Sequence, residues 1–279
     1  MSTVIAAPRP KMFAVLNNLV GEARRRSPVL FGVSVAHLLL LALMLAVMPF
    51  DAREVLGLNL WIKPIKFAVA NTVYMLTLGW LLFHAPVSAR ARRRVEWLVA
   101  ASMIAETLAI TFQAARGTTS HFNMSSWTNA GVLALMGVMI LVNTAAVVYV
   151  AWRFWRGRAA VSGPYLWGVR LGLLIFLLAG LEGFVMIGLM SHTVGAADGG
   201  AGLPFVNWST RAGDLRVAHF VGMHALQALP LAGHLLSSTR LRAPEQVRTR
   251  ASIIFGALYG AVALLLFVQA LTGRPLVSL

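Results

Sequence analysis

The chain has 279 residues, of which 58% are hydrophobic and only 12% are charged. Soluble domains carry about 25% charged residues, so this composition indicates a protein whose solvent is lipid. The sequence contains no cysteine, which excludes disulfides, thiolate nucleophiles and cysteine-held metal or iron–sulfur centres. The net charge of +15 does not indicate nucleic-acid binding, because the basic residues lie in short clusters between apolar runs, as in cytoplasmic membrane loops.

Residues 1–27 are expected to form a cytoplasmic basic segment with a short amphipathic helix on the inner membrane surface. Met12, Leu16 and Val20 recur at helical spacing before the basic run Arg24–Arg26. An apolar face combined with basic residues is typical of helices that lie in the membrane interface. A cleaved signal peptide fits less well, because the basic region is too long.

Seven apolar runs follow, and each is close to the ~20 residues that a helix needs to cross a bilayer. We therefore predict an all-α polytopic membrane protein with one seven-helix membrane domain over residues 28–279. The predicted spans are 28–48, 61–83, 95–115, 128–152, 166–190, 214–237 and 251–272.

The loops between these runs alternate in charge. The N-terminal segment and the loops after the second, fourth and sixth runs each hold several arginines, whereas the other loops hold few basic residues. Cytoplasmic loops carry the excess of lysine and arginine, so we predict an N-terminus inside and a C-terminus outside a cell membrane. The basic, cysteine-free chain with short loops favours a bacterial inner membrane.

A weak internal repeat is also visible. The third run ends in Phe112-Gln-Ala-Ala-Arg-Gly117, and the seventh ends in Phe267-Val-Gln-Ala-Leu-Thr-Gly-Arg274. The first three and the last three runs both start inside. They are therefore compatible with two parallel repeats that flank the fourth run, a plan that some transporters use.

Polar side chains within the apolar runs are the candidate functional residues, because lipid does not solvate them. At ~1.5 Å rise per residue, Glu106, Glu182, His224 and His37 lie roughly 12–16 Å below the outer ends of their spans. His219 lies about 7 Å down by the same count. We expect a ligand or proton site in the outer half of the bilayer, formed by Glu106, Gln113, Glu182, His219, His224 and Gln227.

Basic residues are expected at the outer mouth above this site. They are Lys63, Lys66, Arg116 and Arg216. Positive charge around a mouth draws in anions, so the leading hypothesis is binding or transport of a small anionic or zwitterionic solute. The buried carboxylates would allow proton coupling.

The alternative hypothesis is a haem- or metal-binding membrane oxidoreductase. His37 and His224 have nearly the same estimated depth on different helices, which suits the two axial ligands of a haem b. His219 and His224 with Glu106 and Glu182 would instead suit a transition metal, and a last candidate ligand is His121, in the loop after the third run.

A third hypothesis is a structural membrane subunit whose buried charges serve only helix packing. The sequence leaves open whether the protein is an enzyme. The expected partners are the lipid bilayer and a small solute, with no nucleic acid.

Overall fold

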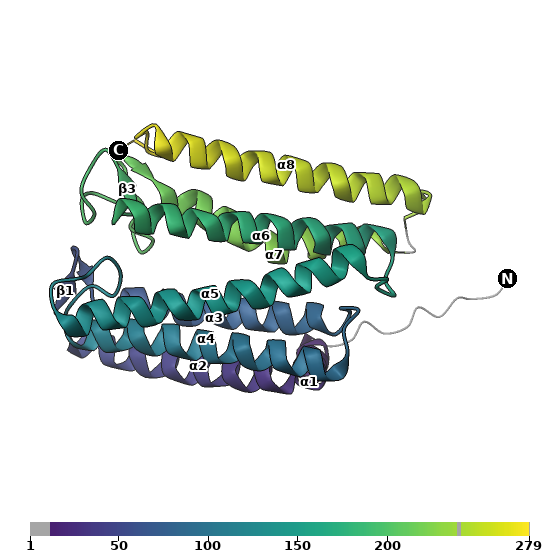
Figure 1. Ribbon diagram of the computed structural model, residues 1–279, viewed down its shortest axis with the longest axis horizontal. Coiled ribbons are helices and arrows are strands. Elements are labelled where there is room, and N and C mark those ends of the chain that lie inside the picture. The colour runs from purple at the N-terminus through teal and green to yellow at the C-terminus, as the bar shows by residue number, and fades with distance from the viewer. Residues whose placement is uncertain (1–11, 239–240, 279) are drawn as a thin grey trace.

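The computed structural model describes residues 12–238 and 241–278, which are mostly α-helical (Figure 1). The long helices are α2 (Pro28–Val47), α3 (Ile62–Leu82), α4 (Ala89–Ala115), α5 (Trp127–Arg156), α6 (Gly163–Leu189), α7 (Leu215–Leu236) and α8 (Glu245–Leu271). A shorter helix, α1 (Met12–Arg26), precedes them, and a 3-10 turn, η1 (Met48–Phe50), follows α2. Two antiparallel strand pairs join β1 (Glu54–Val55) to β2 (Leu58–Asn59), and β3 (Thr193–Val194) to β4 (Gly213–Asp214).

Each long helix coincides with one predicted apolar run, and the main differences lie at one end of the bundle. Helix α4 begins at Ala89 rather than at residue 95, and α8 begins at Glu245 rather than at residue 251. The hydroxyl of Ser88 caps α4 by accepting a hydrogen bond from the Ala91 N–H. The arginine-rich first turns are therefore helical, although they are too polar to count as membrane span. Residues 1–11 of the predicted N-terminal segment lie outside the described residues.

Six helices are long and apolar enough to cross a membrane, namely α2 with η1, α3, α4, α5, α6 and α8. The protein is therefore a multi-pass helical membrane protein. Among the described residues this is one candidate span fewer than the seven predicted, because Arg216, Gln227 and three histidines reduce the hydropathy of α7.

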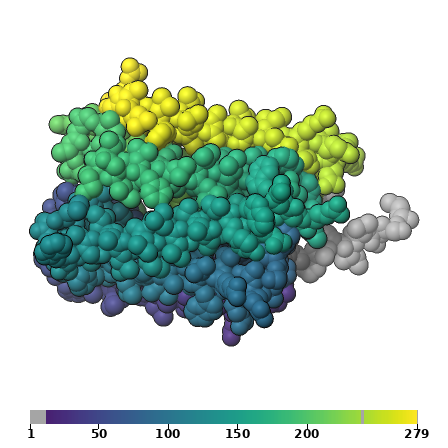
Figure 2. Space-filling view, viewed as in Figure 1, coloured from purple at the N-terminus to yellow at the C-terminus, as the bar shows by residue number. Residues whose placement is uncertain are grey.

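The helices form two three-helix units with α5 between them (Figure 1). The first unit contains α2, α3 and α4, and the second contains α6, α7 and α8. Helix α5 packs on α4 on one side and on α6 on the other, and its side chains fill the boundary between the units on the face shown in Figure 2. The largest apolar core connects the units, with Met75, Val99, Val147, Phe176 and Leu226 among its buried members.

The two units share their order of elements, which is a helix, a strand pair and then two helices. Their last helices also end in the same way. Gln113 of α4 and Gln269 of α8 each donate through Nε2 to the backbone carbonyl six residues further along, at 3.5 and 2.7 Å. Four residues after each glutamine, Gly117 and Gly273 adopt φ values of +70° and +74°. These matching helix ends support the internal repeat.

Equivalent glycines let the second helix of each unit approach the start of the first. A Cβ on Gly79 of α3 would lie 2.9 Å from Cβ of Ser27, and one on Gly233 of α7 would lie 2.5 Å from the Pro164 carbonyl oxygen. Helix α3 therefore corresponds to α7 in the repeat. Close helix contact through small residues is the usual basis of packing in lipid, where burial of apolar surface gives little driving force.

We predict that Gly233→Ala destabilises the protein by about 1–3 kcal/mol, because the added methyl group overpacks the contact between α7 and α6. The matched control is Gly180→Ala on α6, where a Cβ would meet nothing within 4 Å. Alanine favours a helix over glycine by about 1 kcal/mol, so the control should be neutral or more stable. Thermal unfolding in detergent measures both variants, and equal midpoints would contradict the close packing.

Candidate functional site

The arginine-rich loops meet at one end of the bundle, here called the basic end. Arg26, at the end of α1, donates to Nε2 of His84 at 2.9 Å. Arg153 of α5 donates to the carbonyl of Pro86. The hydroxyls of Ser162, before α6, and Ser237, after α7, lie 2.6 Å apart. Every segment that the sequence assigned to the inside is thus represented at one end.

The remaining loops meet at the opposite end, where the loop 190–214 covers the start of α3. Lys66 of α3 donates to the carbonyls of Phe205 and Val206 at 3.1 and 3.4 Å. The rings of Phe122, in the loop after α4, and His192 have centroids 4.8 Å apart. This end therefore combines loops from both three-helix units.

Lys63, in the first turn of α3, lies at the centre of the opposite end. Its Nζ is 3.2 Å from Nδ1 of His121. An ammonium group has three donors, and no other acceptor and no ion pair reaches Lys63 from the described part of the chain. Glu106 and Asp198 act on it only through longer-range charge interactions. A largely buried cation with unfilled donors is costly unless an anion or water supplies the missing acceptors.

The imidazole of His121 is neutral at physiological pH. Burial lowers its pKa well below the ordinary value of 6.5, and the positive charges of Lys63 and His192 act in the same direction. Nδ1 of His121 is also 2.9 Å from the Ser120 hydroxyl. The neutral ring can therefore accept at Nδ1 from Lys63 while it carries its proton on Nε2.

The carboxylate of Asp198 is fully used within its own loop. It accepts from Nδ1 of His192 at 2.6 Å, from the N–H groups of His192 and Thr193, and from the hydroxyls of Ser191 and Thr193. Burial opposes its ionised form, but the hydrogen bond and charge of His192, with the other donors, outweigh burial and lower the pKa of Asp198. This carboxylate holds the loop in shape and does not neutralise Lys63.

The other basic residues predicted at the mouth also lie at this end, but they have partners. Arg216 is paired with Asp214 at 2.6 Å. Arg116 donates to the side-chain oxygens of Gln113 and Asn129 at 2.6 and 2.8 Å. With Lys66 held by two carbonyls, Lys63 is the mouth cation with the fewest partners among the described residues.

The structure separates the histidines that the sequence placed at similar depth. His37 of α2 lies 2.9 Å through Nδ1 from the Val33 carbonyl and 2.9 Å through Nε2 from Oγ1 of Thr107 on α4. Asn71 of α3 donates to the same Thr107 oxygen at 2.9 Å. This network connects three helices, and both ring nitrogens of His37 are used in it rather than being open to an iron atom.

The two histidines of α7 point to different surroundings. Nδ1 of His219 is 2.8 Å from the Ala179 carbonyl of α6. Nδ1 of His224 is 2.8 Å from the carbonyl of Phe220 on its own helix, and the two rings lie 4.1 Å apart. In the described part of the chain, no group of three or more histidine, aspartate or glutamate side chains is arranged to hold a metal ion.

Glu106 and Glu182, the two carboxylates predicted within the spans, have no ion-pair partner among the described residues. Glu106 of α4 is 7% exposed and interacts with Lys63 only through longer-range charge. One carboxylate oxygen of Glu182 on α6 is buried without a hydrogen-bond partner. Gln227 of α7 donates to Oγ1 of Thr77 on α3 at 3.2 Å, so the corresponding helices of the two units touch through polar groups.

Sequence reasoning missed the pairing of Lys63 with His121. The two residues are 58 positions apart, and hydropathy says nothing about the path of the loop that brings them together. The sequence did mark both residues separately, the lysine as a mouth cation and the histidine as a candidate ligand. Comparison adds no further guide, since no protein-family model, characterised protein or solved structure matches the chain significantly.

We predict that the protein becomes less stable as the pH falls from about 8 to about 5, in part because of His121. Its pKa is lowered in the folded state, so the unfolded chain binds more protons below about pH 6.5 and stability is lost as pH decreases through this window. His121→Asn keeps an acceptor near Nδ1 and should flatten the dependence of the unfolding midpoint on pH.

The matched control is His234→Gln, which changes an exposed histidine near the basic end. It should keep the slope of the unmodified protein. Identical slopes for the His121→Asn variant and the unmodified protein would show that this histidine is not held neutral by the fold.

Proposed function

We propose that the protein is a seven-helix membrane protein that binds a small anionic or zwitterionic solute at Lys63 and moves it across the bilayer. The observation that carries the proposal is the largely buried ammonium of Lys63, which has His121 as its one acceptor in the described part of the chain. An anionic group of a solute would supply the missing acceptors. Charged groups of both repeat units, Glu106 and Arg216, act on Lys63, and transporters built from repeats bind their substrates at the interface of the repeats.

The seventh crossing in this proposal is α7. Helices α6 and α8 both run from the basic end to the opposite end, and α7 returns the chain between them. Its polar side chains His219 and Gln227 contact α6 and α3. They therefore face protein rather than lipid, which makes a polar crossing tolerable.

The positive-inside rule places the basic end in the cytoplasm, so that the N-terminal segment is inside and the end of α8 is outside. In this orientation α1 lies in the inner interface. Its apolar residues Met12 and Phe13 are both 77% exposed, and its last turn contains Arg24, Arg25 and Arg26. That combination is typical of an interfacial helix, and it suits a bacterial inner membrane with anionic lipids.

The charges around Lys63 define the class of solute. Lys66 and Arg216 add positive charge nearby, which attracts a carboxylate or phosphate group. Glu106 lies deeper along α4 and interacts with Lys63, so it is the group that would face the ammonium of a zwitterion. A carboxyl group within the bilayer is also suited to carry a proton in coupled transport.

The haem or metal alternative gains no support from the positions of its candidate ligands. Nδ1 of His37 is used by the Val33 carbonyl of its own helix and Nε2 by Thr107 of α4, and His219 is held by α6. The structural hypothesis does describe one part of the molecule, because the network of His37, Thr107 and Asn71 connects α2, α3 and α4.

We predict that Lys63→Gln weakens binding of the solute about 10- to 100-fold, as expected for the loss of charged hydrogen bonds worth about 1.5–3 kcal/mol. A panel of carboxylates, amino acids and inorganic phosphate is first screened for a rise in the unfolding midpoint of the purified protein. Any stabilising compound is then tested for uptake into proteoliposomes.

The control is Arg158→Gln, which removes one positive charge from the basic end. It should bind and take up the compound like the unmodified protein. Equal binding by the Lys63→Gln variant, or an equal loss in the control, would refute a solute site at Lys63. The Glu106→Gln variant separates solute binding from transport. A loss of uptake with unchanged binding would assign Glu106 to proton coupling.

The topology has its own test, because the chain has no cysteine that would interfere. Single cysteines are introduced by Ala197→Cys before α7 and by Ala243→Cys after it. A membrane-impermeant maleimide added outside intact cells should label the first position only. Labelling of both positions from the same side would rule out a crossing by α7.

A further inference from the structure

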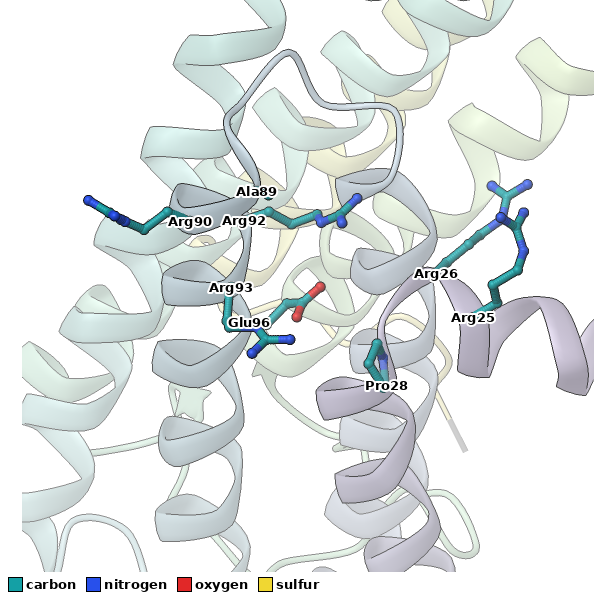
Figure 3. A pocket seen from close by; sticks show the side chains of 8 residues that line it. All are labelled: Arg25, Arg26, Pro28, Ala89, Arg90, Arg92, Arg93 and Glu96. Atoms are coloured by element: carbon teal, nitrogen blue, oxygen red, sulfur yellow. The ribbon is translucent and has the colours of Figure 1, made fainter.

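A second candidate site lies at the basic end, far from Lys63. A cavity of about 480 Å³ separates the start of α4 from the junction of α1 and α2 (Figure 3). Its lining contains five arginines and one glutamate. The full lining is Arg25, Arg26, Pro28, Ala89, Arg90, Arg92, Arg93 and Glu96.

The arginines on the α1 side already have partners. Arg25 and Arg26 both pair with Glu22 at 2.7 Å. The guanidinium of Arg26 also lies over the ring of Trp80, at 3.8 Å from its centroid. These contacts fix one wall of the cavity, and they leave positive charge on it, because two arginines share one glutamate.

The arginines on the α4 side have no such partners. The guanidinium groups of Arg90, Arg92 and Arg93 form no hydrogen bond or ion pair with the described residues, and Arg92 and Arg93 interact with Glu96 only through longer-range charge. Figure 3 shows Arg92 and Glu96 reaching from α4 into the space, with Arg93 beside Glu96. Next to Pro28, the Ser27 hydroxyl is buried and interacts with the Glu96 carboxylate. The cavity thus presents unfilled donors and an excess of positive charge.

A second hollow begins where the first ends. It measures about 470 Å³ and is lined by Arg90, Arg93, Arg94, Trp97 and Leu98. Trp97 is 57% exposed and Leu98 is 46% exposed, both on the outer face of α4. Tryptophan at this level is typical of the membrane interface, so an apolar surface continues directly from the arginine cluster toward the lipid.

We propose that the cavity binds the phosphate group of an anionic phospholipid, whose glycerol and acyl chains lie along Trp97 and Leu98. Arginine suits phosphate because its planar guanidinium can donate two hydrogen bonds at once. A free phosphate ion has the same charged group, but it has no apolar part that could contact Trp97 and Leu98. Because the cavity is at the opposite end of the bundle from Lys63, the assignment is independent of the proposed solute site.

The test uses the purified full chain in a neutral detergent. Short-chain phosphatidylglycerol, short-chain phosphatidylcholine and inorganic phosphate are titrated separately, and native mass spectrometry counts the bound molecules. We expect the unmodified protein to bind phosphatidylglycerol in preference to the other two. In the double variant Arg92→Gln/Arg93→Gln, the affinity for phosphatidylglycerol should decrease roughly 25-fold, because the loss of each arginine weakens binding about fivefold.

The matched control is the double variant Arg242→Gln/Arg250→Gln, which removes the same charge from the α7–α8 side of the basic end. It should lose less than about fivefold. Glu96→Gln removes the negative charge that faces the cavity and should tighten binding. This gain provides a second readout that does not depend on how well the arginine variant folds.

The outcomes separate the possible sources of phosphate. The lipid site is supported if the unmodified protein binds phosphatidylglycerol selectively, the arginine variant loses this binding, and Glu96→Gln strengthens it. The lipid assignment is overturned if inorganic phosphate binds as tightly as phosphatidylglycerol and displaces it. Unchanged affinity in the arginine variant, or an equal loss in the control, overturns the site as a whole.

Discussion

The close approach of α7 to α6 is the contact on which the second unit depends. Gly168 and Gly172 of α6 face the backbone of α7, and Gly222 and Gly233 of α7 face α6, each at a distance that leaves no room for a Cβ. In lipid such contacts replace the burial of apolar surface as the source of packing energy. They hold α7 deep in the bundle, where its polar side chains meet protein groups instead of hydrocarbon.

Satisfaction of buried polar groups distinguishes two kinds of polar residue in the described part of the chain, those with a complete set of partners and those without. His37 is within hydrogen-bond distance of partners at both ring nitrogens, and the Asp198 carboxylate has a full set of donors. Lys63 and the arginines of α4 lack such sets within the described residues. The two ends of the bundle therefore differ: one contains the enclosed ammonium of Lys63, and the other an open cluster of guanidinium groups.

Apolar runs predicted every long helix, because the thickness of a bilayer imposes a length that is visible in the sequence. Charge in the loops also predicted which segments meet at each end. Depth counting was less informative, since it gave a height without a direction around the helix. His37 and His224 have similar predicted heights, yet His37 contacts α4 and His224 contacts its own helix. Those directions depend on how the helices pack against one another, which a single sequence does not reveal.

The residues that precede α3 and α7 explain why Arg216 has an ion-pair partner and Lys63 has none in the described part of the chain. Lys63 and Arg216 are both the second residue of their helices, so they occupy similar places in the two units. The N-cap of α7 is Asp214, which neutralises Arg216, whereas the N-cap of α3 is Trp61, which donates instead to Asp51. The residue two positions before each cation therefore decides its pairing: a carboxylate there gives an ion pair, and an indole there gives none.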